Sequence, residues 1–388
     1  MAKKARRAAA AKRVKQYIKL QPGDFPFTVL VTGLLIFGVV MVFSASYYSS
    51  LNTSGSPYSY FIKELIFSVT GFGFMVFFAM VDYHKLKKWG GYLMIASVIL
   101  LVLVLTPLGT SVNGAQRWLG VGVLSIMPGE VAKLTAIIFV AGFFATDSRR
   151  ILSFGKGILP MIILTGLLVG LVMGQPNMST AITIAGIIVS MMFVAGMQYR
   201  YLIGLGALGG AGIIGLILMP GGEYRMQRVT TFMNPFADAA GEGYQVVQSL
   251  LALGSGGIMG AGLGKSVQKT LYLPEPQNDF ILAVIGEELG FVGIAVLMII
   301  YMVLVWRGIK IAMNAPDRFG MLLASGITVM IGLQVILNVA VVTSSMPATG
   351  VILPFISYGG NALWLFMIAA GIMLNISRHN KTEGTNRK

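Results

Sequence analysis

The sequence predicts an all-α, polytopic membrane protein with about ten transmembrane helices and one long extracellular loop. Hydrophobic residues make up 56% of the chain and charged residues 11%, whereas an average soluble domain carries roughly 25% charged residues. The mean hydropathy of +0.79 agrees with this composition. The apolar residues also gather in runs close to the roughly 20 residues that a helix needs to cross a bilayer.

Ten such runs follow one another along the chain, and the third, fourth and fifth are the shortest. They cover residues 27–47, 62–80, 92–105, 131–144, 158–172, 180–197, 202–219, 280–306, 321–342 and 351–376. Inside lipid every backbone polar group must bond within its own segment, so each run is predicted to be a helix. Together they define a membrane domain, 27–376, between a basic tail, 1–26, and a second tail, 377–388.

Positive charges lie mostly on one side of this topology. An even number of spans puts both termini on the same side, and most of the 29 Lys and Arg fall in the tails and in the loops of that side. Cytoplasmic loops carry this excess, so both termini are predicted to be cytoplasmic. The net charge of +15 then needs no nucleic acid to explain it. The basic start could also belong to a signal peptide, but its apolar run exceeds the usual 7 to 15 or so residues and favours a retained anchor.

The polar chemistry is concentrated in three segments of the opposite, external face: 106–130, 220–279 and 343–350. The second is far longer than the usual connection of about 4 to 6 residues. Within it, residues 245–253 have helical apolar spacing and predict an amphipathic helix. The glycine-rich stretch 254–266 is a poor match to a phosphate-binding loop, since Met259 stands where that motif needs glycine. Close backbone approach and tight turns are the favoured interpretation.

The external face offers few groups for acid–base chemistry. The chain has no cysteine, and both of its histidines fall on the cytoplasmic side, so a general base must be a carboxylate or an unusual lysine. Asp279 is the foremost candidate, because it ends the long polar loop where a span begins and could be partly desolvated there. The alternative is a helix cap or a first-turn acid favoured by the helix dipole.

Other charged residues near this face are each open to two interpretations. Glu130 and Lys133 can pair on one helix face, or Lys133 can extend to the membrane interface. Glu287 and Glu288 lie two turns into a span, where a structural hydrogen-bonding role competes with a proton relay. Three external arginines could clamp phosphate oxygens or could simply be solvated: Arg117, Arg225 and Arg228.

An ordered series of short motifs runs along the chain. The blocks are 113–119 (Asn-Gly-Ala-Gln-Arg-Trp-Leu), 128–134 (Pro-Gly-Glu-Val-Ala-Lys-Leu), 224–238, 243–249, 264–280, 285–290 (Ile-Gly-Glu-Glu-Leu-Gly) and 353–360 (Leu-Pro-Phe-Ile-Ser-Tyr-Gly-Gly). On these motifs the sequence resembles the SEDS family (FtsW, RodA and SpoVE), with FtsW and SpoVE looking closest. The resemblance extends from the first span to the last.

The resemblance implies a peptidoglycan glycosyltransferase. Such an enzyme polymerises lipid II, an undecaprenyl-pyrophosphate-linked sugar, into glycan strands on the outer face of the bacterial cytoplasmic membrane during division or sporulation. In that family the aspartate before a phenylalanine, here Asp279, is taken as essential. It would act as the general base that accepts a proton from the acceptor hydroxyl while the donor carbon inverts.

The same resemblance suggests roles for the remaining charged residues. Arg117, Lys133 and one or both of Arg225 and Arg228 would stabilise the pyrophosphate leaving group. Glu130 would orient Lys133, and Glu275 would shape the acceptor side. The chain departs from the family at several positions: Gly129 replaces serine, Asn177 replaces an external aspartate, and residues 276–278 lack the histidine that usually adjoins the key acid.

Cofactors, partners and rival functions complete the predictions. No ligand spacing in the sequence demands a metal, although a divalent cation such as Mg²⁺ or Mn²⁺ could accompany the pyrophosphate. The expected partners are lipid II, a single-span class B penicillin-binding transpeptidase, and division or elongation proteins. The rivals are a transporter that flips lipid II and a non-catalytic division scaffold. Few charges lie inside the spans and the acids cluster on one face, which favours chemistry at that face.

Overall fold

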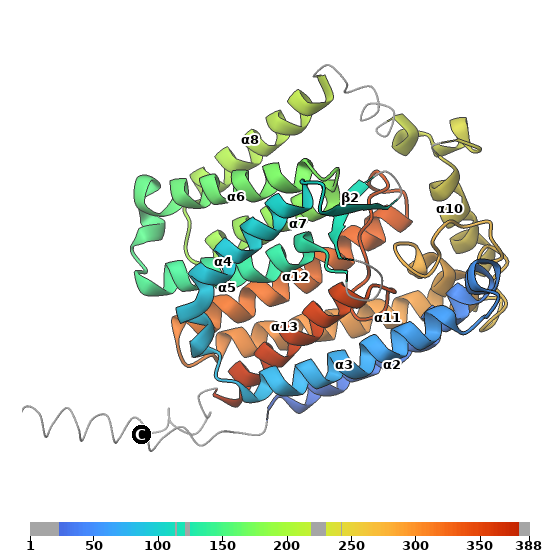
Figure 1. The fold of residues 1–388 in the computed structure, drawn as a ribbon, viewed down its shortest axis with the longest axis horizontal. Helices are drawn as coiled ribbons and strands as arrows, with labels where there is room; N and C mark the ends of the chain where they lie inside the picture. Colours follow the sequence, from blue (N-terminus) through green and yellow to red (C-terminus); the bar gives the residue numbers. More distant parts are fainter. Residues whose placement is uncertain (1–22, 113–114, 121–124, 219–229, 242, 380–388) are drawn as a thin grey trace, which may run out of the picture.

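The computed structural model describes residues 23–112, 115–120, 125–218, 230–241 and 243–379. Within them the protein is a bundle of long helices with one small β-hairpin (Figure 1). The long helices are α2 (Phe25–Ser54), α3 (Ser59–Met80), α4 (His84–Val104), α5 (Pro128–Thr146), α6 (Leu159–Met173), α7 (Met178–Val194), α8 (Tyr199–Leu218), α11 (Ile281–Met313), α12 (Arg318–Val342) and α13 (Gly360–Arg378). The shorter elements are β1 (Gly109–Val112), β2 (Ala115–Leu119), α10 (Tyr244–Gly256), a π-turn at Phe154–Ile158 and 3₁₀ turns at Arg150–Leu152 and Pro235–Asp238.

Each predicted span coincides with one of the long helices, so the all-α membrane architecture is confirmed. Eight helices in the described part of the chain are long and apolar enough to cross a membrane, and α7 is a shorter apolar helix. The seventh predicted run is α8. The predicted amphipathic helix in the long loop is α10, which packs against α11.

Two predicted span starts were wrong, and two predicted span ends fell short, because α2 continues from residue 47 to Ser54 and α11 continues from residue 306 to Met313. The third span was predicted to begin at residue 92, but α4 begins at His84, because basic residues that prefer the interface can still occupy the first turns of a helix. The last span was predicted to begin at residue 351, but residues 351–359 are not helical and α13 begins at Gly360. Hydropathy cannot separate a buried irregular segment from a helix, because both are apolar.

Several helices begin at side-chain caps that satisfy free backbone amides. Asp24 Oδ1 accepts from the Phe27 amide at 2.9 Å, and Asp317 Oδ1 accepts from the Gly320 amide at 2.9 Å. Asn177 Oδ1 accepts from the Thr180 amide at 3.3 Å and caps α7. Asn177, which stands where an aspartate was expected, therefore has a capping function in this chain.

The helices differ in how much of their apolar surface other helices cover. About 67% of the most apolar stretch of α12 is buried, against 22% in α3. Helices α5, α12 and α13 form the centre, whereas α2, α3, α4, α6 and α11 keep broad apolar faces exposed. Exposed apolar faces of this length are what a lipid environment covers, so the bundle fits a multi-pass membrane protein.

The beginning of α2 and the end of α13 lie at the same end of the bundle. The Asp24 amide donates to Ser377 Oγ at 2.9 Å, and Asp24 Oδ2 pairs with Arg307 Nη2 at 2.5 Å. The loops 55–58 and 343–359 therefore lie at the opposite end, since each follows or precedes a full helix. The site described below is at that opposite end.

Helix α11 is interrupted at Gly290, which has φ 68° and ψ −170°. The glycine-rich stretch after α10 bonds to the backbone freed by this break. The amides of Ala261 and Gly262 donate to the carbonyls of Glu287 and Glu288, both at 2.9 Å, and the Phe291 amide donates to Gly257 O at 2.9 Å. A side chain at Gly260 would collide with the Glu288 backbone, which supports the interpretation of these glycines as close-approach residues.

Candidate active site

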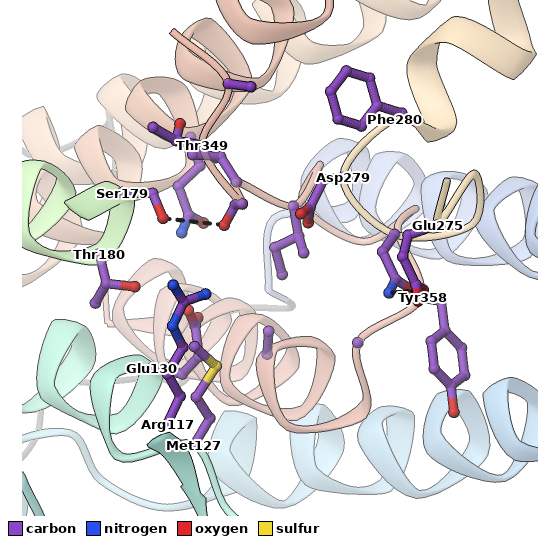
Figure 2. A pocket seen from close by; sticks show the side chains of 18 of the residues that line it. Arg117, Met127, Glu130, Ser179, Thr180, Glu275, Asp279, Phe280, Thr349 and Tyr358 are labelled. Carbon is purple, nitrogen blue, oxygen red and sulfur yellow. Dashed lines mark hydrogen bonds between the residues drawn. The ribbon is translucent and has the colours of Figure 1, made fainter. Parts of the chain in front are cut away.

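A cavity of about 800 Å³ opens at the end of the bundle opposite the termini. Its walls come from the first turns of α3, α5 and α7, from α12, from strand β2, and from the segments before α11 and α13. Five predicted site residues line it: Arg117, Glu130, Lys133, Glu275 and Asp279. Residues that are far apart in the sequence are therefore brought together around one space, as Figure 2 shows for most of them.

Asp279 lies in the irregular segment just before α11, and its carboxylate faces the cavity (Figure 2). The N-cap of α11 is Phe280, and no side chain caps this helix, so the alternative interpretation of Asp279 as a cap is wrong. Burial, followed by the negative charge of Glu275, raises the pKa of Asp279 to about 7, and Arg117 opposes this rise. The carboxylate is therefore able to take up and release a proton near neutral pH.

The backbone around Asp279 is held by Asn338 of α12. The Asn338 Nδ2 donates to the carbonyl oxygens of Asp279, at 2.8 Å, and of Val351, at 2.6 Å. Asn338 is completely buried. The Asn338 amide group therefore holds the segment before α11 and the segment before α13 together. No motif or charge pattern in the sequence had selected this residue.

Glu130 and Lys133 form a buried ion pair in the first turns of α5. The distance from Lys133 Nζ to Glu130 Oε1 is 2.7 Å, and the side chains are 4% and 9% exposed. The predicted pairing is confirmed, and Lys133 lines the cavity rather than extending to the interface. The pair is neutral as a whole, but Lys133 Nζ has further N–H donors besides the one directed at Glu130, and an anionic ligand in the cavity can accept from them.

Arg117 reaches the cavity from β2. Its guanidinium donates to the carbonyls of Gln175, at 3.4 Å from Nε, and of Pro176. These carbonyls directly precede the capped start of α7, so the arginine is fixed between the hairpin and that helix. Figure 2 shows its guanidinium pointing into the space that Asp279 also faces.

Glu275 and two tyrosines form another side of the cavity. Glu275 has a φ of 47° and accepts hydrogen bonds at Oε2 from Asn278 Nδ2, at 2.9 Å, and from Gln277 Nε2, at 3.1 Å. Tyr60 and Tyr358 pack edge to face with ring centroids 5.1 Å apart. Burial, with negative charge nearby, raises the pKa of Tyr358 to about 12, so its hydroxyl remains protonated as a donor.

Glu287 and Glu288 do not line the cavity, and their hydrogen-bond partners favour the structural role over the proton relay. Glu288 Oε1 pairs with Lys269 Nζ at 2.6 Å and accepts from Ser44 Oγ at 2.7 Å. Glu287 accepts from Ser266 Oγ at 2.5 Å and from the Val267 amide at 2.8 Å. Both carboxylates thus fasten the end of the long loop to α11, a structural role.

Two predicted residues, Arg225 and Arg228, lie outside the described residues. Sequence reasoning also missed several uncharged residues that line the cavity: Ser179, Thr180, Thr183, Gln334 and Thr349. Neutral hydroxyl and amide side chains carry no charge signal, and only the polarity of the segment 343–350 pointed toward any of them. In the part of the chain that the structure describes, no three His, Asp or Glu residues gather as a metal site would require. A cation accompanying the pyrophosphate stays a prediction.

Comparison with known proteins agrees with this geometry. A family model described as a cell cycle protein, for FtsW, RodA and SpoVE, matches residues 26–382. The chain belongs to the FtsW/RodA/SpoVE family. The stage V sporulation protein E of Bacillus subtilis is 41% identical over 92% of this chain and 98% of its own length. A probable peptidoglycan glycosyltransferase FtsW of Geobacter sp. strain M18 is 37% identical over 91% of this chain and 96% of its own.

Solved structures show the same fold for other members of the FtsW/RodA/SpoVE family. RodA of Thermus thermophilus superposes with a TM-score of 0.69 at 27% identity, covering 93% of this chain and 98% of that one. A chain from a structure of a peptidoglycan synthase complex, described as coordinating polymerization and crosslinking, superposes with a TM-score of 0.75 at 26% identity. It covers 92% of this chain and 98% of the matched one.

Proposed function

We propose that this protein is an inverting peptidoglycan glycosyltransferase that polymerises lipid II. The observation that carries the proposal is the Asp279 carboxylate, which lies in a cavity together with Arg117 and Lys133. The pKa of this carboxylate is raised to about 7. A base that titrates near neutral pH can take the proton of an acceptor hydroxyl, and two cationic side chains can stabilise the charge of a departing pyrophosphate. The family relatives named as peptidoglycan glycosyltransferases support this assignment.

In the proposed reaction the acceptor N-acetylglucosamine 4-hydroxyl attacks C1 of the donor N-acetylmuramic acid. Asp279 accepts the hydroxyl proton as the new C1–O bond forms and the bond from C1 to the pyrophosphate oxygen breaks. The carbon inverts from α to β in this single displacement, and undecaprenyl pyrophosphate leaves with the bonding electrons. Arg117 and Lys133 stabilise the negative charge that develops on it, while Glu130 orients Lys133.

The proposed arrangement in the cell follows from the charge distribution and from the relatives. Both termini are cytoplasmic and the cavity opens on the extracellular face, because the basic residues gather at the end with the termini. A transpeptidase of the class B penicillin-binding type would act beside it, as the relative in a peptidoglycan synthase complex suggests. The lipid tails would lie against the exposed apolar helix faces. Division and elongation proteins are further proposed partners.

The test compares the parent protein, Asp279→Asn and Asp147→Asn, each purified with the cognate transpeptidase and supplied with lipid II. Asp147 is an exposed acid at the other end of α5 and serves as a matched control. Glycan polymer from the parent and the control, with a loss of about 10²–10⁴-fold in Asp279→Asn, supports the proposal. Equal product from all three removes Asp279 from the mechanism. No product from a folded parent favours the transporter, which a lipid II flipping assay would then test.

A further inference from the structure

One side of the cavity carries hydroxyl and amide side chains without a charge. We call it the neutral wall; it consists of Ser179, Thr180, Thr183, Gln334 and Thr349. Helix α7 supplies the first three, α12 supplies the glutamine, and the segment before α13 supplies the last. Figure 2 shows Ser179, Thr180 and Thr349 on the side away from Glu275 and Tyr358.

Two polar atoms of the neutral wall have no hydrogen-bond partner among the described residues. They are Gln334 Oε1 and Thr349 Oγ1, and their residues are only 2% and 8% exposed. A buried polar atom without a partner costs about 1–3 kcal/mol, so such atoms call for a specific explanation. Both residues line the cavity, so a rotation of either side chain would bring its unpartnered oxygen within reach of a ligand that has its own hydrogen-bonding groups.

The neutral wall adjoins Asp279 through Gly350. Ser179 Oγ donates to Gly350 O at 3.2 Å, and a Cβ on Gly350 would lie 3.0 Å from Asp279 Oδ2. The absence of a side chain at Gly350 therefore leaves the carboxylate in contact with the space in front of the wall. A ligand bound to the neutral wall would therefore have one side next to the Asp279 carboxylate.

The chemistry of the neutral wall selects one part of the proposed substrate. A phosphate would bind to cations, which lie on β2 and α5 as Arg117 and Lys133, and a lipid tail would avoid exposed hydroxyls. A neutral sugar ring with hydroxyl and acetamido groups both donates and accepts hydrogen bonds, as Thr and Gln side chains do.

We propose that the neutral wall is the subsite for an N-acetylated hexose ring of the substrate, whose hydroxyl it presents to Asp279. The amide N–H of the sugar donates to Gln334 Oε1, and its hydroxyls bond to Thr349 and Thr180. This inference rests on the proposed glycosyltransferase function. In this proposal the neutral wall orients the sugar, whereas Arg117 and Lys133 bind the pyrophosphate.

The test measures equilibrium binding of lipid II and of undecaprenyl pyrophosphate, which lacks the sugars, in the Asp279→Asn background so that no turnover occurs. The variants are Thr349→Val and Gln334→Leu, and the control is Thr328→Val, a buried α12 threonine outside the cavity. Each wall variant is expected to weaken lipid II binding about tenfold, the equivalent of one lost hydrogen bond of about 1.4 kcal/mol. Undecaprenyl pyrophosphate binding should change less than about twofold.

Thermal unfolding separates this role from a structural one. Because the wall atoms lack protein partners, the two wall variants should unfold no lower than the parent. Unchanged lipid II binding in both variants, or equal weakening for both ligands, would overturn the proposal. Failure of the proposed function shows differently, as a parent with Asp279 intact that binds lipid II and makes no polymer.

Discussion

Asp279 and the pair Glu287 and Glu288 lie within one short stretch of chain, yet their surroundings are opposite. The two glutamates are saturated with partners: Lys269, Ser44 and Ser266 side chains and backbone amides. Asp279 faces a cavity beside another acid, and its pKa is raised. Glu287 and Glu288 stabilise the fold because their charges are satisfied by a cation or by hydrogen-bond donors. Asp279 is suited to proton transfer because its environment makes its ionised form unfavourable.

The strongest way to test this contrast is to break the buried pair. Lys269→Met leaves the Glu288 carboxylate without its cation, which typically costs about 3–5 kcal/mol of folding free energy. Thermal unfolding in detergent should show a large drop, whereas turnover per folded molecule is retained. Adding Glu288→Gln should restore much of the stability. Equal unfolding temperatures for the single and double variants would contradict a structural role for the pair.

A pH profile tests the other half of the contrast. The reaction needs ionised Asp279, and its pKa of about 7 makes the protonated form dominant below that pH. The polymerisation rate should fall about tenfold for each unit of pH below roughly 6. The raised pKa also makes ionisation unfavourable to folding, so Asp279→Asn should gain stability relative to the parent as pH rises from about 4 to about 7, and this gain should level off above pH 7. A flat rate from pH 5 to 8 would exclude this carboxylate as the base.

Asn338 contributes to both stability and reactivity, because it is buried in the core and holds the backbone of Asp279. Asn338→Leu leaves the carbonyls of Asp279 and Val351 without their donor, at about 1–3 kcal/mol for each unsatisfied group. Both stability and turnover should fall. Asn375→Leu is the matched control, since Asn375 is equally buried and bonds to Tyr83 N and Ala79 O at the other end of the bundle. We expect turnover to fall only in Asn338→Leu. If Asn375→Leu loses stability and turnover to the same extent as Asn338→Leu, Asn338 has no special role at the site.

The smallest expected effect concerns Glu275. Glu275→Gln removes the negative charge that is the second cause of the raised Asp279 pKa, so the acid limb of the rate profile should move to lower pH. Arg117→Met removes the opposing positive charge and should move that limb to higher pH. Profiles measured with the same lipid II concentration check both directions. Shifts of the same sign in both variants would show that charge is not the cause.

The sequence predicted the helices better than it predicted their ends or the break within α11. Spans are fixed by long apolar runs, which are visible residue by residue. The irregular segment 351–359 is just as apolar as a span, and Gly290 is only one glycine among many. Which glycine breaks a helix depends on the backbone that replaces its hydrogen bonds, and here that backbone is residues 257–262.

The sequence also predicted only part of the candidate site: its charged residues were found and its neutral residues were missed. Five charged residues predicted for the site surround the cavity, because charge beside a membrane span is rare enough to stand out. The neutral wall and Asn338 were missed, since Thr, Gln and Asn are common in helices and their roles depend on which neighbours lack partners. The pairing of Glu288 with Lys269 was likewise unpredictable, because the lysine lies in a loop whose path the sequence does not reveal.

The backbone bonds between residues 257–262 and the break in α11 also have a mechanical consequence. These bonds, together with those of Glu287 and Glu288 to residues 266–269, tie the glycine-rich stretch, the end of the loop and the first half of α11 into one stiff body. Asp279 belongs to the same body. Ile258, Met259 and Leu263 are exposed on the rim of this body, and Asn338 fastens the body to α12 at Asp279. A partner that packs on these three side chains would therefore contact the same bonded unit that carries the Asp279 carboxylate.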